Sequence, residues 1–429
     1  MYVKIGTTEY AKLRDLSFAP ETDLTGDTIP INEFRVDILT DDTITIGVYA
    51  ELYDDLDNLW ARYWISYAER VDAGRLRIIA KSLIALLDQR VMAADMYESE
   101  SVTNVLQDVF EGMDSADWTM SEDFDEVTLT GYVPEQTARE RLQWVCFVMG
   151  AYVRTYFTDR VWILPIDTTA TIVPQNMTLI DVRPVTSFKD WVTAISAKVY
   201  SYAQGTPGAT DQWVEVGGAY YIQTEQTVTL TNNEAPAAAP ANVITIEDMT
   251  LLNSSNVSAV LSYLATYYFK RTEVELDVVN NAAYMPGDKL SVYANRSTMY
   301  TGFLSKCTFA FGVQARARLR VSPVDLTPSA KLILSYTWDG ILIAQRTYTF
   351  PVGYSYSISN PYIDTVINGH RYVFRPEAAN ATGTIEAGTN TNTQACAVAL
   401  DLYQGVLHII SVDEVTVETD DDVSVGVIS

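Results

Sequence analysis

The sequence has few of the residues that most enzymes and metal sites use. Its 429 residues include only two histidines, His370 and His408, and three cysteines, Cys146, Cys307 and Cys396. So little histidine excludes HExxH zinc sites and leaves few candidates for a Ser-His-Asp triad. Three cysteines so far apart make neither a disulfide framework nor a zinc site. They suit a reducing compartment, with a single bridge left open.

Basic residues are scarce as well. The chain has 29 lysines and arginines against 55 acidic residues, which gives a net charge of -26 and a pI near 4.3. This excess of negative charge argues against a protein that binds nucleic acid tightly or binds to an anionic membrane surface. No apolar run reaches about 18 residues, and the N-terminus has no apolar core of a signal peptide. We therefore expect neither a transmembrane helix nor a secretory signal.

Hydrophobic and aromatic residues are plentiful. Hydrophobic residues make up 48% of the chain, and 27 tyrosines, 13 phenylalanines and 8 tryptophans favour β-structure. Alternation at Phe34, Val36 and Ile38 predicts one half-buried strand, and alternation over 44–48 predicts another. The residues 152–157 and 161–164 form a predicted hairpin. Further strands are expected at 273–279, 289–293, 300–311 and 315–321.

Three segments have the apolar period of a helix. Residues 101–112 carry one apolar stripe, with Ser99 or Ser101 as the expected N-cap. A second helix should begin at Thr137, where Thr137 and Glu140 form a capping box, and end at Gly150. The third should span 256–269. Cys146 lies on the apolar face of the second helix and is therefore expected to be a buried hydrophobe.

No catalytic signature is present. The sequence has no P-loop, no GxSxG elbow and no GxGxxG motif. Asp54, Asp55 and Asp57 could bind calcium, but the glycine and final glutamate of an EF-hand are missing, so a solvated loop is favoured. The acidic run 420–422 has the same interpretation, and the histidines are expected to be surface or hydrogen-bonded residues of a β domain. We predict no catalytic residue, no metal, no cofactor and no enzymatic activity.

Two basic clusters stand out in so acidic a chain. They comprise Arg75, Arg77 and Lys81, and then Lys306, Arg316, Arg318 and Arg320. The favoured interpretation is an ordinary solvent-facing surface with ion pairs inside the chain. The alternative is contact with an acidic surface on a neighbouring copy or partner, and these seven residues are our candidates for it.

Four segments in sequence order resemble the central hub proteins of phage tails and related contractile injection systems. The first three are 73–88 (AGRLRIIAKSLIALLD), the helix of 101–112, and 132–143 (YVPEQTARERLQ) leading into 149–153. The fourth is the helix of 256–269 followed by 285–292 (MPGDKLSV) and the strand that starts at 300–303 (YTGF). The family includes the T4-type baseplate hub, hub-like prophage proteins and the N-terminal part of siphophage tail-associated proteins. The resemblance covers about three quarters of the chain.

The resemblance implies an α+β, mostly β fold. It comprises a first tail-tube-like β-barrel (1–95), an α/β insertion (96–170) and a second barrel with one helix (171–328). Such hubs are homotrimers whose six barrels match the sixfold ring of the tail tube. The implied function is therefore a virion structural protein, assembled in the bacterial cytoplasm, that joins the tube or distal tail protein to tip, spike or fibre proteins. Its acidic wall would repel DNA passing through the channel.

Residues 329–429 are predicted to form a separate small β domain, either a β-grasp or a sandwich. Pro323 and Pro328 bracket the expected linker, and Asp339-Gly340 predicts a tight hairpin. The segments 336–344 and 348–361 resemble mucin-binding-type repeats of surface proteins, which makes a host glycan a candidate ligand. Two other functions stay open at this point: a cell-surface adhesin or carbohydrate-binding protein, and a tail-associated peptidoglycan hydrolase acting through a carboxylate pair.

Overall fold

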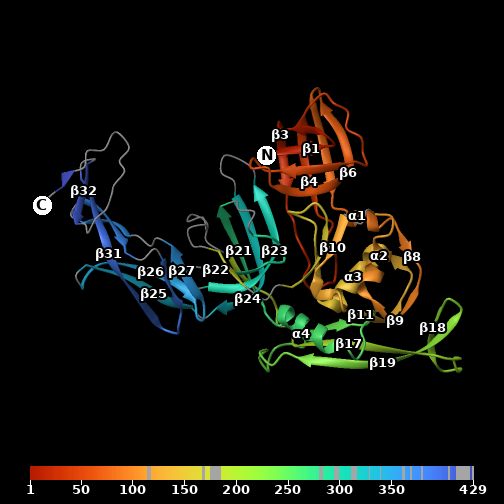
Figure 1. The fold of residues 1–429 in the computed structure, drawn as a ribbon. Helices are drawn as coiled ribbons and strands as arrows, with labels where there is room; N and C mark the ends of the chain where they lie inside the picture. Colours follow the sequence, from red (N-terminus) through yellow and green to blue (C-terminus); the bar gives the residue numbers. More distant parts are fainter. Residues whose placement is uncertain are drawn as a thin grey trace. The chain divides into compact units, whose positions relative to one another are not determined.

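Most of the described chain is β-strand, with four α-helices among the described residues (Figure 1). The computed structural model describes residues 1–113, 117–166, 170–173, 185–279, 284–293, 299–310, 316–327, 329–338, 340–359, 363–367, 370–377, 380–403, 406–411 and 426–427. The chain divides into two units. Unit 1 is Met1–Ala294 with Tyr300–Asp325, and unit 2 is Asn295–Met299 with Leu326–Ser429. Within the described ranges, no helix is long and apolar enough to cross a membrane.

Unit 1 is built on a sheet of thirteen strands in which one strand order occurs twice. The order β3-β4-β7-β6-β5 of a first module recurs as β16-β21-β24-β23-β22 in a second module, and β23 pairs with β3. The first module consists of β3 (Leu13–Phe18), β4 (Glu33–Leu39), β5 (Tyr49–Tyr53), β6 (Leu59–Asp72) and β7 (Arg75–Lys81). The second consists of β16 (Val185–Phe188), β21 (Thr272–Val279), β22 (Lys289–Tyr293), β23 (Met299–Ala310) and β24 (Arg316–Thr327). The remaining strands are β1 (Tyr2–Ile5), β2 (Thr8–Tyr10) and β15 (Thr171–Ile172).

The alternating residues of both modules face one shared core. Phe34, Val36 and Ile38 of β4 are fully buried, as their spacing predicts. The matching residues of β21, Val274, Leu276 and Val278, are buried in the same cluster. The side chains between them point to the opposite face of the sheet, and the candidate site lies on that face.

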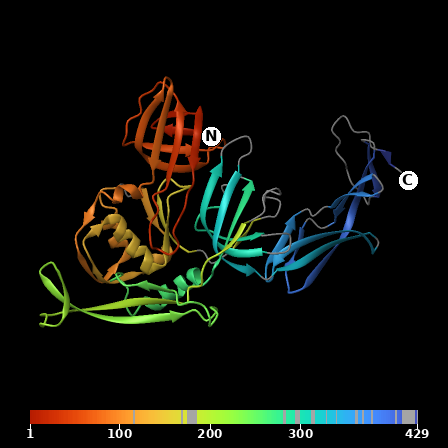
Figure 2. The same cartoon turned by 180° about the vertical axis from the view of Figure 1, so that it is seen from behind.

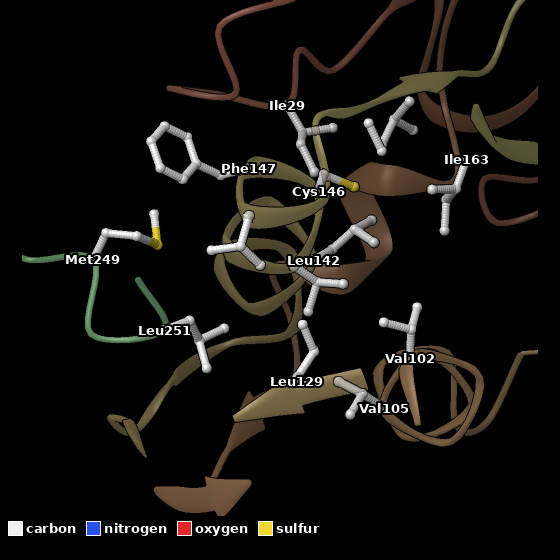
Figure 3. Packing of buried hydrophobic residues seen from close by; sticks show 14 of the residues in the cluster. Ile29, Val102, Val105, Leu129, Leu142, Cys146, Phe147, Ile163, Met249 and Leu251 are labelled. Carbon is white, nitrogen blue, oxygen red and sulfur yellow. The ribbon is translucent and has the colours of Figure 1, made fainter. Parts of the chain in front are cut away.

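An α/β part follows the first module. Its helices are α1 (Ile84–Leu87), α2 (Val102–Val109) and α3 (Ala138–Met149), and its strands are β8 (Val91–Met92), β9 (Asp95–Ser101), β10 (Trp118–Met120), β11 (Thr128–Val133), β12 (Gln136–Thr137), β13 (Ala151–Arg154) and β14 (Val161–Pro165). Figure 3 shows Leu142 and Cys146 of α3 inside the core of this part, with Val105 of α2 and Leu251 also contributing. Cys146 is 2% exposed and burial raises the pKa of its thiol to about 12, which confirms it as a buried hydrophobe.

Helix α3 begins and ends where the sequence predicts. The Glu140 amide donates to Thr137 Oγ1 at 3.2 Å, and the Thr137 amide donates to Glu140 Oε2 at 2.8 Å, so the capping box is complete. Gly150 ends the helix in the left-handed conformation, with φ at 65°. The hairpin of β13 and β14 is confirmed, and β14 also pairs in parallel with β10, which was not predicted.

A separate four-stranded sheet lies between β16 and β21 in the sequence. Its order is β18-β19-β17-β20, and its strands are β17 (Ala194–Gln204), β18 (Gln212–Val216), β19 (Ala219–Thr231) and β20 (Val243–Ile246). The predicted third helix, α4 (Val257–Tyr268), packs against β17 and β19. The end of the sheet that carries β18 extends past α4 with no helix on it (Figures 1 and 2). We call residues 201–223 the arm.

In unit 2 all described elements are strands. They are β25 (Ser329–Trp338), β26 (Ile341–Pro351), β27 (Ser355–Ser359), β28 (Ile363–Ile367), β29 (His370–Pro376), β30 (Asn380–Thr384), β31 (Thr389–Tyr403), β32 (Val406–Ser411) and β33 (Gly426–Val427). Trp338 pairs with Ile341, which confirms the tight β25–β26 hairpin. Leu332, Leu334 and Tyr336 form the centre of its core.

Two predictions of local structure were wrong. Residues 44–48 are not a strand: Gly47 turns the chain with φ at 94°, and Ile46 is 55% exposed. The segment after Pro323, which we expected to be an irregular linker, is strand β24 as far as Thr327, although the two units do divide inside it, between Asp325 and Leu326. The β21–β24 register shifts beside this proline, and a bulge allows a residue without an N–H group to stay in the ladder. Pro328 lies outside the described residues.

Candidate inter-subunit surface

The two modules carry the same ion pair at the same place in the strand ladder. Asp37 of β4 lies directly opposite Arg77 of β7, and Asp277 of β21 lies directly opposite Arg318 of β24. Arg77 donates to both Asp37 oxygens at 2.8 and 3.0 Å. Arg318 does the same to Asp277 at 2.8 and 3.2 Å. These four residues point away from the shared core, because they alternate with its buried side chains.

Both carboxylates are covered although they lie on the outward face. The Asp37 side chain is 0% exposed and that of Asp277 is 11% exposed, whereas Arg77 and Arg318 are 25% and 60% exposed. The planar guanidinium therefore shields each carboxylate and keeps its own contact with water. The hydrogen bond to the aspartate raises the pKa of Arg77 and likewise that of Arg318.

Arg320 extends this arrangement in the second module. Its Nε lies 2.7 Å from Glu273 and 3.9 Å from Glu275, and Lys189 lies 3.3 Å from Glu273. Burial acts to raise the pKa of Glu273, but the hydrogen bond and charge of Arg320, with Lys189, outweigh it and hold that pKa below its usual value. Glu273 is therefore ionised at neutral pH.

The other predicted contact residues differ in their surroundings. Arg75 Nε lies 3.1 Å from Asp72, and Lys306 Nζ lies 2.5 Å from Glu21. Lys81 stands opposite Glu33 in the ladder. Arg316 pairs through its backbone with Val279, and its side chain lies outside the described part.

Five of the seven candidates are therefore held in ion pairs within the chain: Arg75, Arg77, Lys306, Arg318 and Arg320. Ion pairs within the chain are what we expected of an ordinary solvent-facing surface. Contact with a neighbouring subunit remains a prediction for all seven residues.

Sequence reasoning missed a neighbouring group of residues on the same outward face of the first module. Arg14 stands opposite Asp37, and Arg35 and Tyr67 both stand opposite Ile79. Arg14 and Arg35 are exposed, and neither has an ion pair among the described residues. Tyr67 is 41% exposed. Only the strand register, which the sequence does not reveal, brings these residues together.

Sequence reasoning also missed the arm. Trp213 is 47% exposed and Tyr220 is 39% exposed, and their rings meet edge to face with centroids 5.1 Å apart. One signal was available, because residues 199–269 contain no lysine, arginine or histidine.

Of the remaining candidates from the sequence, the structure describes only the aspartate-rich loop. Asp54 accepts hydrogen bonds from the amides of Leu56 and Asn58, so it stabilises its own loop. Across the described ranges, no group of His, Cys, Asp and Glu is arranged to hold a metal ion. A cavity of about 400 Å³ beside α4 has a mostly apolar lining. The side chains of His370 and His408, and residues 420–422, lie outside the described part.

No protein-family model matches the sequence, and no curated protein matches it. Solved structures do match. A tail protein from Neisseria meningitidis aligns with a TM-score of 0.53 and 11% identity, over 75% of this chain and 95% of that one. A 43 kDa tail protein of a Shewanella oneidensis prophage aligns with a TM-score of 0.52 and 10% identity, over 76% and 99%. The chain thus resembles phage and prophage tail proteins in fold.

Proposed function

We propose that this protein is the structural hub of a phage tail or phage-tail-like particle. In this proposal three copies form a ring that joins the tail tube or distal tail protein to the tip, spike or fibre proteins. The protein would assemble in the bacterial cytoplasm and act in the virion tail. The likeness in fold to two tail proteins supports this assignment.

The repeated strand module is the observation that carries the proposal. A chain with two equivalent modules presents six of them when three copies form a ring, and the tail tube of the resembling family has sixfold symmetry. We propose that each module is a tail-tube-like β-barrel and that the α/β part is the insertion between them. The matching register of Asp37–Arg77 and Asp277–Arg318 supports this equivalence more strongly than strand order alone.

The charge of the chain fits a channel wall. A net charge of -26 per copy would repel the phosphate backbone, so that DNA slides through without sticking. The role is structural and uses no cofactor. The C-terminal module, with a host glycan as its candidate ligand, stays a prediction, and so does its resemblance to mucin-binding repeats.

Mass measurement tests the proposal directly. Native mass spectrometry or light scattering of the purified protein should give about three times 47.8 kDa, on the order of 143 kDa for the closed ring. A protein that stays monomeric at high concentration would contradict the trimeric hub. Zymography on peptidoglycan should show no clearing, and clearing that one Asp or Glu substitution abolishes would favour the hydrolase instead.

A further inference from the structure

The arm has an exposed apolar face flanked by acids. Trp213 stands opposite Ile222, and Glu215 stands opposite Tyr220, so these four side chains share one face of the β18–β19 ladder. Asp211 lies just before β18. Since residues 199–269 contain no basic residue, nothing in the arm itself neutralises these acids.

The arm is tied to the rest of the described chain only at its base, where Ser201 bonds to Thr224, Gln223 bonds to Glu225 and the ring of Tyr202 lies near that of Tyr132. The described hydrogen bonds of residues 203–222 all join the arm to itself, for example from the Gly208 amide to Asp211. A small sheet without a second layer gains little stability of its own and usually needs a packing partner. Large exposed aromatic side chains on such a sheet are typical of an interface.

The first module has a face of complementary chemistry. Arg14 and Arg35 are exposed there on adjacent strands without ion pairs in the described chain. Ile79 and Tyr67 continue the row of Arg35 on the next two strands and supply apolar surface beside it. The guanidinium of an arginine stacks well on tryptophan and tyrosine and pairs with carboxylates. We call Arg14, Arg35, Tyr67 and Ile79 the receiving face.

We propose that the arm of one copy docks on the receiving face of a second copy of this chain. Trp213 and Tyr220 would pack against Tyr67 and the arginines, and Glu215 would pair with Arg35. Because the two surfaces differ, the contact is head to tail, and three such contacts close a ring if the rotation permits. The inference rests on the proposed trimeric hub and names one of its contacts.

Trp213 and Tyr220 can each bury about 150–250 Å². A stable interface buries roughly 800 Å² on each partner, so the arm contact would be only part of the trimer interface. Tryptophan and tyrosine at the centre of an interface nevertheless carry most of its affinity. The double variant W213A/Y220A should therefore raise the dissociation constant of the trimer roughly 30-fold or more. The matched control is Val243→Ala, which truncates a side chain that is 47% exposed on β20 of the same sheet.

A charge exchange tests the pairing itself. Glu215→Arg and Arg35→Glu should each weaken assembly, measured by sedimentation velocity over a concentration series, and the two together should restore it. If the wild type is a trimer and neither W213A/Y220A nor the charge variants weaken it, the arm inference is wrong and the hub proposal stands. A wild type that is only monomeric refutes both.

Cross-linking gives a readout that does not depend on the stability of the aromatic variants. The three natural cysteines are buried, so a chain with Tyr67→Cys and Tyr220→Cys offers two accessible thiols. Oxidation should give covalent dimers and trimers on a non-reducing gel. The same chain with Val243→Cys in place of Tyr220→Cys should not. Equal yields from both chains would overturn the proposed contact.

Discussion

The paired aspartates of the two modules allow a matched test of how burial sets the strength of an ion pair. Asp37→Asn and Asp277→Asn remove the same charge from equivalent positions at nearly constant size. In each variant the side-chain oxygen of the asparagine can still accept one N–H of the arginine. Its NH₂ group faces the second N–H of the arginine and cannot accept a hydrogen bond from it. The variants differ in burial, because Asp37 is 0% exposed under an arginine that is 25% exposed, whereas Arg318 is 60% exposed. Asp37 also has a second arginine nearby, since Arg75 Nη1 lies 3.8 Å from it.

We expect Asp37→Asn to lower the free energy of unfolding by about 2 kcal/mol, since hydrogen bonds to buried charged groups contribute roughly 1.5–3 kcal/mol. That loss corresponds to roughly a 30-fold change in the unfolding equilibrium. Asp277→Asn should cost about 1 kcal/mol or less, because solvent screens a pair whose arginine is mostly exposed.

Urea denaturation followed by tryptophan fluorescence measures the difference. All tryptophans except Trp338 belong to unit 1, so the signal reports mainly on the unit that carries both pairs. Asp190→Asn is the control, since Asp190 is exposed and has no side-chain hydrogen bond in the described structure. Equal losses from both variants, or a larger loss at Asp277, would refute the argument from burial.

Three further outcomes follow from local geometry. The pKa of Glu273 is lowered in the folded chain, so its charge stabilises the fold at pH values above the usual pKa near 4.5. This contribution is lost as the pH falls below that value. The difference in urea midpoint between the wild type and Glu273→Gln should therefore be large at pH 7 and small at pH 3. Thr137→Ala removes the capping box and should cost about 1 kcal/mol in urea denaturation, whereas Thr137→Ser should cost little. Gly287→Ala should cost about 2 kcal/mol or more, because φ is 98° and the new methyl group would overlap the ring of Tyr152; a melting temperature equal to wild type would contradict this packing.

The sequence predicted individual helices and strands better than it predicted which strands pair with one another. Hydrophobic periods of 2 and 3.6 residues identified β4, β21 and all three longer helices, because an element with one buried face has apolar residues at that spacing. The capping box of α3 was equally visible, since its partners are three residues apart. The strand predicted at residues 44–48 was wrong because the alternation of apolar residues does not show that Gly47 turns the chain.

The candidate surface was harder to predict for the same physical reason. Arg77 and Arg318 were identified as basic residues, but their partners Asp37 and Asp277 lie about 40 residues earlier in the chain. Register decides which charges meet, and register depends on long-range packing that a single sequence does not display. The exposed Trp213 was likewise indistinguishable from a core residue until its strand was placed in a sheet without a covering layer.

Divergence between the two modules bears on how many arms a ring could hold. The ladder position of Arg35 opposite Ile79 in the first module is occupied by Glu275 opposite Arg320 in the second. In the second module the two charges lie 3.9 Å apart and offset one another, whereas Arg35 has no carboxylate within ion-pair distance among the described residues. Only the first module therefore offers an uncompensated cation at this position. If the arm binds there, each copy accepts one arm and donates one, so a ring of three would contain three arm contacts although it contains six modules.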